Sequence, residues 1–312
     1  MLKNKKNLVT GATGFVGSCL VRRLVKNSDK VHIILRRNSD TWRIKDIFKK
    51  TNPHYLDLNN AQMVKKTIKE IKPEVIYHLA AYGNYLEESR KNLETNIFGT
   101  LNLLEACHKI GYDIFVNTGS SSEYGAKSKP MSEKDLLEPN SYYAVAKAGQ
   151  SLLCQHLARE RKLPVITLRL FSVYGPYEGP KRLVPTLVNN CLRGKDLSLT
   201  SPKTARDFIF VDDVVEAYLK AAQSPNLAGH IFNIGTGEQS SLEKVVSIII
   251  KLTDVKVEQN WGNMSNRSFD TNTWLADISK ARRILKWQPK HNLEKGLSKT
   301  ISWFKMNSQL YQ

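Results

Sequence analysis

The sequence predicts an α/β protein built on a doubly wound parallel sheet, and three observations carry this prediction. Strand-like and helix-like segments alternate from the N-terminus to about residue 175. A glycine-rich run, Gly11-Ala12-Thr13-Gly14-Phe15-Val16-Gly17, joins the first predicted strand to the first predicted helix. After Gly175-Pro176 the alternation loosens. We therefore expect one domain over residues 1–175 and a smaller α/β lobe over residues 176–312, with some later segments returning to the first domain.

Each predicted element follows from its local pattern of apolar and turn-forming residues. Pro53 precedes the third strand, and Gly111 ends the third helix. In the first domain we expect strands at 7–10, 31–35, 54–58, 74–80, 113–117 and 164–173, and helices at 14–26, 62–71, 89–109 and 140–161. In the second lobe we expect strands at 197–200 and 208–211, and helices at 184–193, 214–223, 241–252, 278–286 and 293–305.

Composition indicates a cytoplasmic protein without a membrane span. The chain is 41% hydrophobic and 24% charged, and no run approaches the roughly 18–20 apolar residues of a spanning helix. The basic start, Lys3-Asn4-Lys5-Lys6, superficially resembles a signal peptide, but the apolar stretch after it is broken by glycines at a phosphate-loop spacing. The four cysteines are scattered without a Cys-x-x-Cys pair, so we expect reduced thiols and no metal site.

The formal net charge of +18 is unusual and has two interpretations. It could indicate nucleic-acid binding, or a lysine-rich surface that attracts anionic substrates. The lysines are dispersed along the chain, without a basic stripe interleaved with aromatic residues. This distribution favours an anionic small-molecule substrate and no specific nucleic-acid partner.

The glycine-rich run is the first candidate site. Gly11, Gly14 and Gly17 leave room for a tight turn and for close approach of a phosphate to the backbone. An ordinary glycine-rich turn is the alternative. The run follows a strand and opens a helix at the first βα turn, which is the context that binds a dinucleotide pyrophosphate.

The end of the second strand predicts which dinucleotide binds. An acidic residue there would hold the ribose hydroxyls of NAD, but the chain has Arg36 and Arg37. Two guanidinium groups suit the additional phosphate of NADP, so we expect NADP, with NAD as a possible cofactor. A pair of solvated surface arginines is the alternative. Asp57 and Leu58 are candidate adenine contacts, and the small apolar run Leu79-Ala80-Ala81 would let the dinucleotide lie flat across the strand ends.

A Tyr-x-x-x-Lys pair, Tyr143 and Lys147, lies within a predicted helix. Residues four apart share one helix face, so the lysine ammonium can lower the pKa of the phenol. Such a tyrosine can exchange a proton with a sugar hydroxyl or ketone near neutral pH. Proton exchange at a carbonyl beside a bound dinucleotide is the chemistry of hydride transfer.

At this point the chain resembles the extended short-chain dehydrogenase/reductase family, in its nucleotide-sugar branch. The resemblance covers nearly the whole chain and rests on the order and spacing of its motifs. These are the glycine run and the Tyr-x-x-x-Lys pair, with His78-Leu79-Ala80-Ala81, Asn96-x-x-Gly99-Thr100-x-Asn102, Ser120 with Tyr124-Gly125, Arg169-Leu170-Phe171-x-Val173-Tyr174-Gly175-Pro176 and Arg206-Asp207-Phe208-Ile209-x-Val211-Asp212-Asp213. It implies a Rossmann-type N-terminal domain, a small C-terminal lobe for a nucleoside-diphosphate sugar and commonly a homodimer.

The resemblance also implies residue roles. Tyr143 would be the catalytic acid/base, Lys147 would bind the nicotinamide ribose, and Ser120 would hydrogen-bond the reacting sugar oxygen. Because this segment is crowded with hydroxyls, Ser121 and Ser122 are alternatives to Ser120. Further implied cofactor contacts are Thr13, Phe15, Val16, Asn96, Phe171 and Val173. Implied substrate contacts are Tyr82, Glu123, Ser172, Arg182, Arg206 and Arg267, with Arg206 as the main diphosphate ligand.

The residues after Ser120 bear on the reaction. Dehydratases of the family place an acidic pair, or a Ser-Glu variant, where this chain has Ser121 and Ser122, which cannot act as general acid or base at ordinary pKa. Glu123 resembles the pattern of 4-keto-6-deoxysugar reductases, with a loop-capping carboxylate as the alternative. We therefore expect an NADP-dependent reductase of a nucleotide-linked 4-keto-6-deoxyhexose, in polysaccharide or glycoside biosynthesis. The alternative is an NAD(P)-dependent nucleotide-sugar 4-epimerase. A non-catalytic, nucleic-acid-binding protein is disfavoured by the intact Ser/Tyr/Lys set.

Overall fold

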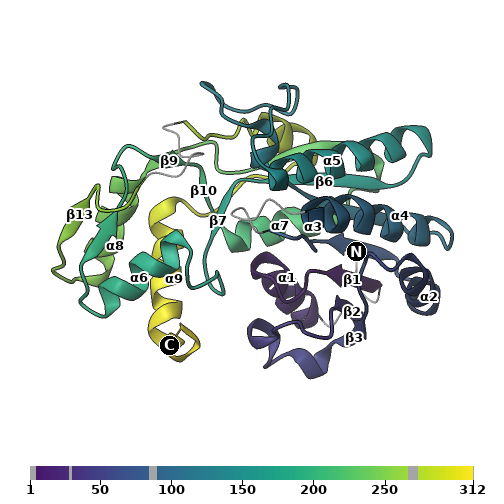
Figure 1. Ribbon diagram of the computed structural model, residues 1–312, viewed down its shortest axis with the longest axis horizontal. Coiled ribbons are helices and arrows are strands. Elements are labelled where there is room, and N and C mark those ends of the chain that lie inside the picture. The colour runs from purple at the N-terminus through teal and green to yellow at the C-terminus, as the bar shows by residue number, and fades with distance from the viewer. Residues whose placement is uncertain (1–4, 28–29, 84–89, 266–272, 312) are drawn as a thin grey trace.

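A seven-stranded parallel sheet forms the centre of the larger domain (Figure 1). The computed structural model describes residues 5–27, 30–83, 90–265 and 273–311. The strand order is β3-β2-β1-β4-β5-β6-β11, and every neighbouring pair is parallel. This is the doubly wound Rossmann-type order, which confirms the predicted fold class. The strands are β1 (Lys6–Thr10), β2 (Lys30–Leu35), β3 (Asn52–Tyr55), β4 (Val75–His78), β5 (Ile114–Ser120), β6 (Val165–Leu170) and β11 (Ile231–Ile234).

Helices cover both faces of this sheet (Figure 1). On one face, α1 (Phe15–Lys26) and α7 (Val211–Ala222) bury an apolar core with β1, β2 and β4. On the other face, α2 (Ala61–Ile71), α4 (Gly99–His108) and α5 (Tyr142–Glu160) form a second core. Because both faces are covered, the strands are nearly continuous apolar runs. The switch in strand order between β1 and β4 places the first βα turn at the centre of the carboxyl edge.

The second lobe lies to the left in Figure 1 and has its own core. It contains α6 (Leu183–Leu192), α8 (Leu242–Thr253) and α9 (Leu293–Met306). Three two-stranded sheets join it: β7 (Ser172–Tyr174) with β10 (Phe208–Phe210), β9 (Ala205–Arg206) with β12 (Ser240–Ser241), and β8 (Leu197–Leu199) with β13 (Gln259–Trp261). Although β11 and α7 follow residue 175, they pack with the large sheet.

Two long elements expected from the sequence are interrupted. The expected strand at 164–173 divides at Phe171, because Ser172 N donates to Asp207 O at 3.0 Å and β7 pairs with β10 instead of β5. Within the described part of the expected helix at 89–109, a π-helical turn, η3 (Glu94–Phe98), separates α3 (Arg90–Leu93) from α4. π-helical turns are frequent at functional sites.

Two smaller differences concern the third strand and a late helix. The third strand is Asn52–Tyr55, so Pro53 lies within it rather than before it; β3 is an edge strand, where a missing N–H is tolerated. The segment expected as a helix at 278–286 contains a π-helical turn, η6 (Ala281–Leu285). Short 3-10 turns are η1 (Trp42–Ile44), η2 (Phe48–Lys50), η4 (Ser121–Tyr124), η5 (Pro225–Leu227) and η7 (Ser308–Tyr311).

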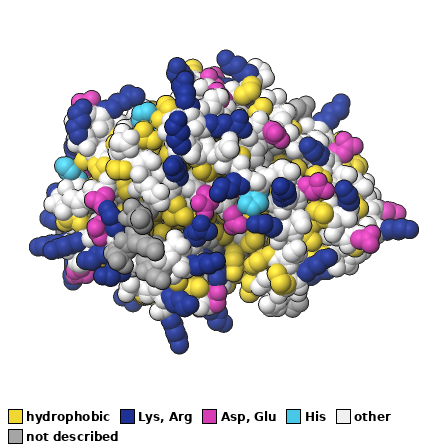
Figure 2. All heavy atoms as spheres, turned by 180° about the vertical axis from the view of Figure 1, so that it is seen from behind, with side chains coloured by type: hydrophobic (Ala, Val, Ile, Leu, Met, Phe, Trp, Pro, Cys, Tyr) yellow, Lys and Arg dark blue, Asp and Glu magenta, His cyan; other side chains and the backbone are white. Residues whose placement is uncertain are grey.

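Two surface observations bear on the expectations from composition. In the described ranges, no helix combines the length and the apolar character that crossing a bilayer requires. Figure 2 shows Lys and Arg side chains spread over one whole face, with Asp and Glu among them.

Candidate functional site

The glycine turn forms a cradle that side chains would fill. Gly11 has φ of +70°, and a Cβ there would lie 2.5 Å from the carbonyl carbon of Leu79. A Cβ on Gly17 would lie 2.1 Å from Gly11 O. Gly14 N donates to Gly11 O at 3.0 Å, which closes the turn directly before α1. The cradle therefore has the shape that a pyrophosphate needs at a helix N-terminus, and the residues fit a dinucleotide.

A buried hydrogen-bonded chain fixes the neighbouring end of β4. Thr10 Oγ1 accepts from Ala80 N at 3.1 Å and lies 2.7 Å from His78 Nδ1, while His78 Nε2 lies 2.8 Å from Thr100 Oγ1. Thr100 Oγ1 donates to Asn96 O at 2.7 Å, so His78 must donate from Nε2 and accept at Nδ1. Burial lowers the pKa of His78 to about 3 and keeps the ring neutral. His78 thus orients the backbone of the predicted Leu79-Ala80-Ala81 surface.

Asn96 acts on the backbone of Tyr82. Its Oδ1 accepts from Tyr82 N at 2.9 Å, and its Nδ2 donates to Tyr82 O at 3.2 Å. Asn96 lies on η3 and is fully buried. Both ends of the Asn96 amide thus bond to Tyr82, and the contact of Asn96 with the cofactor stays a prediction. The π-helical turn places Tyr82, a predicted substrate contact.

The arginine pair lies in an exposed turn at the carboxyl end of β2. Arg36 N donates to Ser39 Oγ at 3.0 Å, and Ser39 N donates to Arg36 O at 3.0 Å. Arg36 and Arg37 are both exposed. The next acidic residue along the chain, Asp40, accepts from Trp42 N at 3.0 Å through Oδ1, two residues ahead.

Tyr143 and Lys147 lie one turn apart on α5. Ser141 caps the helix by accepting from Ala144 N at 3.2 Å. Tyr143 is half-buried, and a Cβ on Gly83 would lie 3.9 Å from its ring. Lys147 is buried, and its Nζ donates to Thr118 O and, at 2.6 Å, to Gln150 Oε1. Burial lowers the pKa of Lys147 to about 8, so the ammonium is still mostly protonated at neutral pH.

The three serines after β5 have different surroundings. Ser120 Oγ lies 2.8 Å from Ser122 Oγ and accepts from Ser122 N at 3.2 Å. Ser121 Oγ accepts from Trp274 Nε1 at 2.9 Å and is buried. Ser120 lies at the end of β5, where parallel-sheet sites form. Its assignment as the catalytic hydroxyl stays a prediction, with Ser122 beside it.

Glu123 has a structural role, which corrects its prediction as a substrate contact. It is fully buried, and its Oε1 accepts from Ser120 N at 2.7 Å and from Ser151 Oγ at 2.9 Å. Its Oε2 pairs with Arg169 Nε at 2.7 Å, and Arg169 is 2% exposed. The loop-capping alternative therefore describes Glu123: it closes a capping box with Ser120.

The second lobe brings Arg206 to the same edge of the molecule. Arg206 is half-buried on β9, its Nη1 donates to Ala205 O at 2.9 Å, and its Cζ lies 5.2 Å from the centre of the Trp274 ring. Trp274 also donates to Ser121, so it connects β9 with the serine segment. Trp274 belongs to none of the motifs that predicted the site. Asp207, fully buried, accepts from the backbone of Gly237 at 3.0 Å and Ala276 at 3.2 Å, which fixes this strand.

The other predicted site residues have varied environments. Arg182 is exposed at the N-cap of α6, and Arg267 lies outside the described residues. Asp57 is exposed, with Oδ1 accepting from Asn59 N at 2.9 Å. Ala81 is exposed, and the buried positions are Leu58, Phe171 and Gly17. The half-buried positions are Thr13, Phe15, Val16, Leu79, Ala80, Tyr82, Ser172 and Val173.

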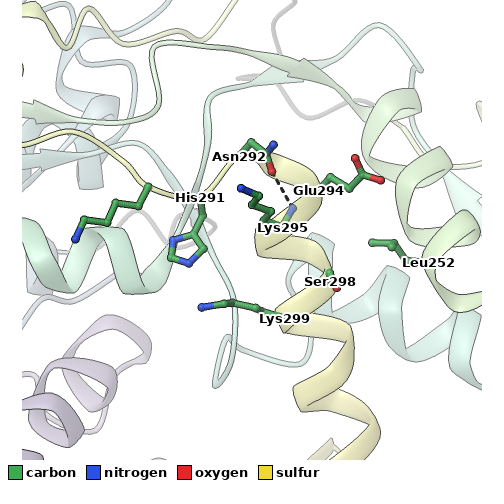
Figure 3. A pocket seen from close by; sticks show the side chains of 8 residues that line it. Leu252, His291, Asn292, Glu294, Lys295, Ser298 and Lys299 are labelled. Carbon is green, nitrogen blue, oxygen red and sulfur yellow. Dashed lines mark hydrogen bonds between the residues drawn. The ribbon is translucent and has the colours of Figure 1, made fainter.

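A separate hollow of about 660 Å³ lies at the start of α9 (Figure 3). Asn292 Oδ1 caps this helix by accepting from Lys295 N at 2.9 Å. Lysines gather here, but Glu294 lies among them. The residues that line the hollow are Leu252, Lys290, His291, Asn292, Glu294, Lys295, Ser298 and Lys299. The predicted cofactor and catalytic residues do not line it.

The sheet, the glycine cradle and the residues at the carboxyl edge define a dinucleotide-binding enzyme of the short-chain dehydrogenase/reductase type. The chain belongs to the NAD dependent epimerase/dehydratase family, whose model matches residues 7–235. This confirms the resemblance drawn from the motifs.

Several relatives match over nearly the whole chain. A Bacillus subtilis (strain 168) protein named uncharacterized UDP-glucose epimerase YtcB is 33% identical over 98% of this chain and 99% of its own. The solved UDP-glucose 4-epimerase of Thermotoga maritima, with UDP-glucose, has a TM-score of 0.88 and 28% identity, covering 97% of this chain and 99% of its own. The UDP-glucuronic acid 4-epimerase of Bacillus cereus, with UDP-glucuronic acid and NAD, has a TM-score of 0.85 and 30% identity, covering 96% and 99%.

Proposed function

We propose that the protein is an NADP-dependent reductase of a nucleotide-linked 4-keto-6-deoxyhexose. The observation that carries this proposal is the exposed pair Arg36 and Arg37 at the end of β2, where a 2′-phosphate would lie. Asp40, the next acid along the chain, lies four residues after Arg36 and accepts a hydrogen bond from Trp42 N through Oδ1. A cofactor that binds as NADPH and leaves as NADP⁺ in each turnover would drive a net reduction. An epimerase instead regenerates its cofactor within each turnover.

The chain's own residues would bind and protonate the substrate. When bound, the dinucleotide supplies a hydride to the carbonyl carbon. Tyr143 would donate a proton to the carbonyl oxygen, and the Lys147 ammonium would stabilise the phenolate that remains. Ser120 would hold the same oxygen by a hydrogen bond. Arg206 would bind the diphosphate, for which a guanidinium is better suited than an ammonium.

A dehydratase is disfavoured by the serine segment. Ser121 and Ser122 occupy the positions where proton transfer at the sugar ring would need an acid or base. Ser121 is also buried against Trp274. Glu123, the nearest carboxylate, is fully buried in its pair with Arg169 and is not available for proton transfer.

An NAD-dependent nucleotide-sugar 4-epimerase is the second candidate. Its support is the similarity to proteins named as epimerases of UDP-sugars, one of them solved with NAD. Such an enzyme would return its hydride to the same substrate and keep its cofactor bound. The Tyr143 and Lys147 pair would serve either reaction.

One experiment separates the two candidates. The dinucleotide that copurifies is released and identified by mass spectrometry, and NADPH oxidation is then assayed with CDP-, GDP-, dTDP- and UDP-linked 4-keto-6-deoxyhexoses. Stoichiometric NADPH oxidation with one of these ketones supports the reductase. A tightly bound NAD, with interconversion of 4-hydroxy epimers and no net oxidation, would replace it with the epimerase.

We expect Arg206→Ala to raise the KM for the sugar nucleotide roughly 10–100-fold, because the variant loses one or more charge-assisted hydrogen bonds to the diphosphate. This effect should persist at moderate salt, because a half-buried contact is screened less than a surface one. Substrate kinetics at several ionic strengths measure it, with Arg206→Lys as the partial control. An unchanged KM in Arg206→Ala would contradict the assignment.

The dispersed lysines should give only weak, non-specific DNA binding that falls steeply with salt, because it rests on counterion release. A salt titration of DNA binding by fluorescence anisotropy measures this. Sequence-selective binding that survives physiological salt would contradict the proposed small-molecule function.

We further propose a homodimer, formed through an exposed apolar stripe on η3 and α5. The stripe consists of Phe98, Tyr142, Val145 and Leu152, which are 57%, 46%, 45% and 53% exposed. Leu152→Lys should convert the dimer to a monomer in light scattering, because a charge at a buried apolar contact is costly. Leu136→Lys is the control, since Leu136 is exposed elsewhere. A wild-type monomer would contradict this proposal.

A further inference from the structure

Lys147 is held by neutral acceptors. Its Nζ donates to Thr118 O and to Gln150 Oε1, the latter at 2.6 Å. An ammonium has three N–H donors, so this arrangement leaves one for a ligand. Gln150 lies three residues after Lys147 on α5 and is fully buried. The two side chains therefore meet across one turn of the same helix.

The orientation of Gln150 is fixed from its other end. Lys147 can only donate, so Oε1 of Gln150 must face it. Gln150 Nε2 then donates to Asn117 Oδ1 at 2.7 Å, and Asn117 Nδ2 donates to Thr167 Oγ1 at 3.2 Å. Asn117 and Thr167 belong to adjacent strands, β5 and β6. The amide of Gln150 is thus anchored to the central sheet and cannot rotate without breaking this chain of bonds.

The charged groups around Lys147 leave an excess positive charge. Glu123 lies on η4 and is paired with Arg169 from β6, both buried. His78 from β4 is neutral, because burial lowers its pKa to about 3. Cys154 from α5 is also neutral, because burial raises its pKa to about 12. Lys147 therefore adds a net positive charge to a balanced buried pair, close to the Tyr143 phenol on the same helix.

We propose that Gln150 is a positioning residue that aims the Lys147 ammonium toward the cofactor ribose and Tyr143 while keeping the surrounding charge positive. A glutamate would hold the ammonium in a similar place but would cancel this charge. An apolar residue would preserve neither the contact nor the charged state of Lys147. The inference rests on the proposed roles of Tyr143 and Lys147, but not on whether the reaction is a reduction or an epimerisation.

The test follows the binding of cofactor as pH rises. A protonated Lys147 should strengthen cofactor binding, so the affinity for the cofactor should fall as the pH rises through the pKa of Lys147. We call this fall in affinity the alkaline limb. NADPH and NADH are titrated by fluorescence in parallel from pH 6 to about 10, in the Tyr143→Phe background, so that the phenol does not titrate. Gln150→Met, Gln150→Glu and the unmodified Gln150 are compared. Gln155→Met, the same change on a half-buried part of α5, is the matched control.

The expected shifts have opposite signs. Gln150→Met removes an acceptor from the charged form, so the pKa of Lys147 falls and the alkaline limb moves down by about 1–2 pH units. Gln150→Glu adds a negative charge, so the limb moves up, and in an otherwise wild-type chain turnover falls because the phenolate is less stabilised. Gln155→Met should leave the limb in place.

Two results would overturn the inference. One is weaker binding at every pH with the alkaline limb unmoved in both Gln150 variants, which indicates a structural role alone. The other is the absence of an alkaline limb with unmodified Gln150. If Gln150→Met does not fold, the alkaline limb of Gln150→Glu is the test: a limb moved to higher pH supports the inference, and an unmoved limb overturns it. Failure of the proposed function would look different, because Tyr143→Phe alone would then retain turnover.

Discussion

Tyr143→Phe is expected to lower kcat by about 10²–10⁴-fold, the usual contribution of a positioned acid/base. Phenylalanine keeps the half-buried ring beside Gly83 and removes only the oxygen that carries the proton. Lys147 keeps its bonds to Thr118 and Gln150, so cofactor affinity should stay near the wild-type value. Steady-state kinetics and a fluorescence titration of NADPH measure the two quantities on the same preparation.

The neighbouring residue provides a matched control for this prediction. Tyr142 begins α5 and is 46% exposed, so Tyr142→Phe removes a phenolic oxygen that has no proposed part in catalysis and keeps the ring in the proposed dimer stripe. Its turnover should equal that of the wild type. If Tyr143→Phe instead retained wild-type turnover, Tyr143 would not be the acid/base and the proposed chemistry would have to be abandoned.

The parts of the site that could be predicted from the sequence are those with a local cause. The glycine cradle depends largely on backbone room within seven residues, and the structure shows this room in the close approach of Gly17 to Gly11. The close approach of Gly11 is to Leu79 after β4, which the local spacing does not reveal. The helical placement of Tyr143 and Lys147 depends on a spacing of four on one helix. The alternation of strands and helices predicts the parallel sheet in the same way.

The parts that could not be predicted depend on partners far away in the chain. Glu123 looked available for a substrate because its partner, Arg169, lies 46 residues later on the adjacent strand. The spacing around Asn96 does not reveal that its amide binds the backbone of Tyr82. Trp274 carries no motif, and only the fold brings it to Ser121 and Arg206.

The break between β6 and β7 has the same kind of cause. Mostly apolar residues run from Val165 to Phe171, interrupted by Thr167 and Arg169, so the pattern predicts one strand. The backbone of Ser172 instead bonds to Asp207, which is anchored in the second lobe. The break therefore follows from how the second lobe joins the sheet, and Val173 packs against the cores of both parts.

The arginine pair should decide the choice of cofactor. The double variant Arg36→Ala/Arg37→Ala is expected to weaken NADPH binding roughly 10–100-fold and to change NADH binding little, because only NADPH carries the 2′-phosphate. The expected loss corresponds to charge-assisted hydrogen bonds at an exposed turn, so it should shrink as salt is raised. Fluorescence titrations of both nucleotides at two ionic strengths measure this difference.

A second double variant separates a local effect from the loss of net charge. Arg159→Ala/Arg161→Ala removes two exposed guanidinium groups at the far end of α5 from Tyr143 and lowers the net charge equally. It should leave the ratio of NADPH to NADH affinity unchanged, since long-range steering by a chain of net charge +18 acts on both nucleotides. Equal affinities for NADPH and NADH in the unmodified protein would contradict the NADP assignment. That result would also shift the proposal to the 4-epimerase, because the case for net reduction depends on an exchangeable NADPH held by Arg36 and Arg37.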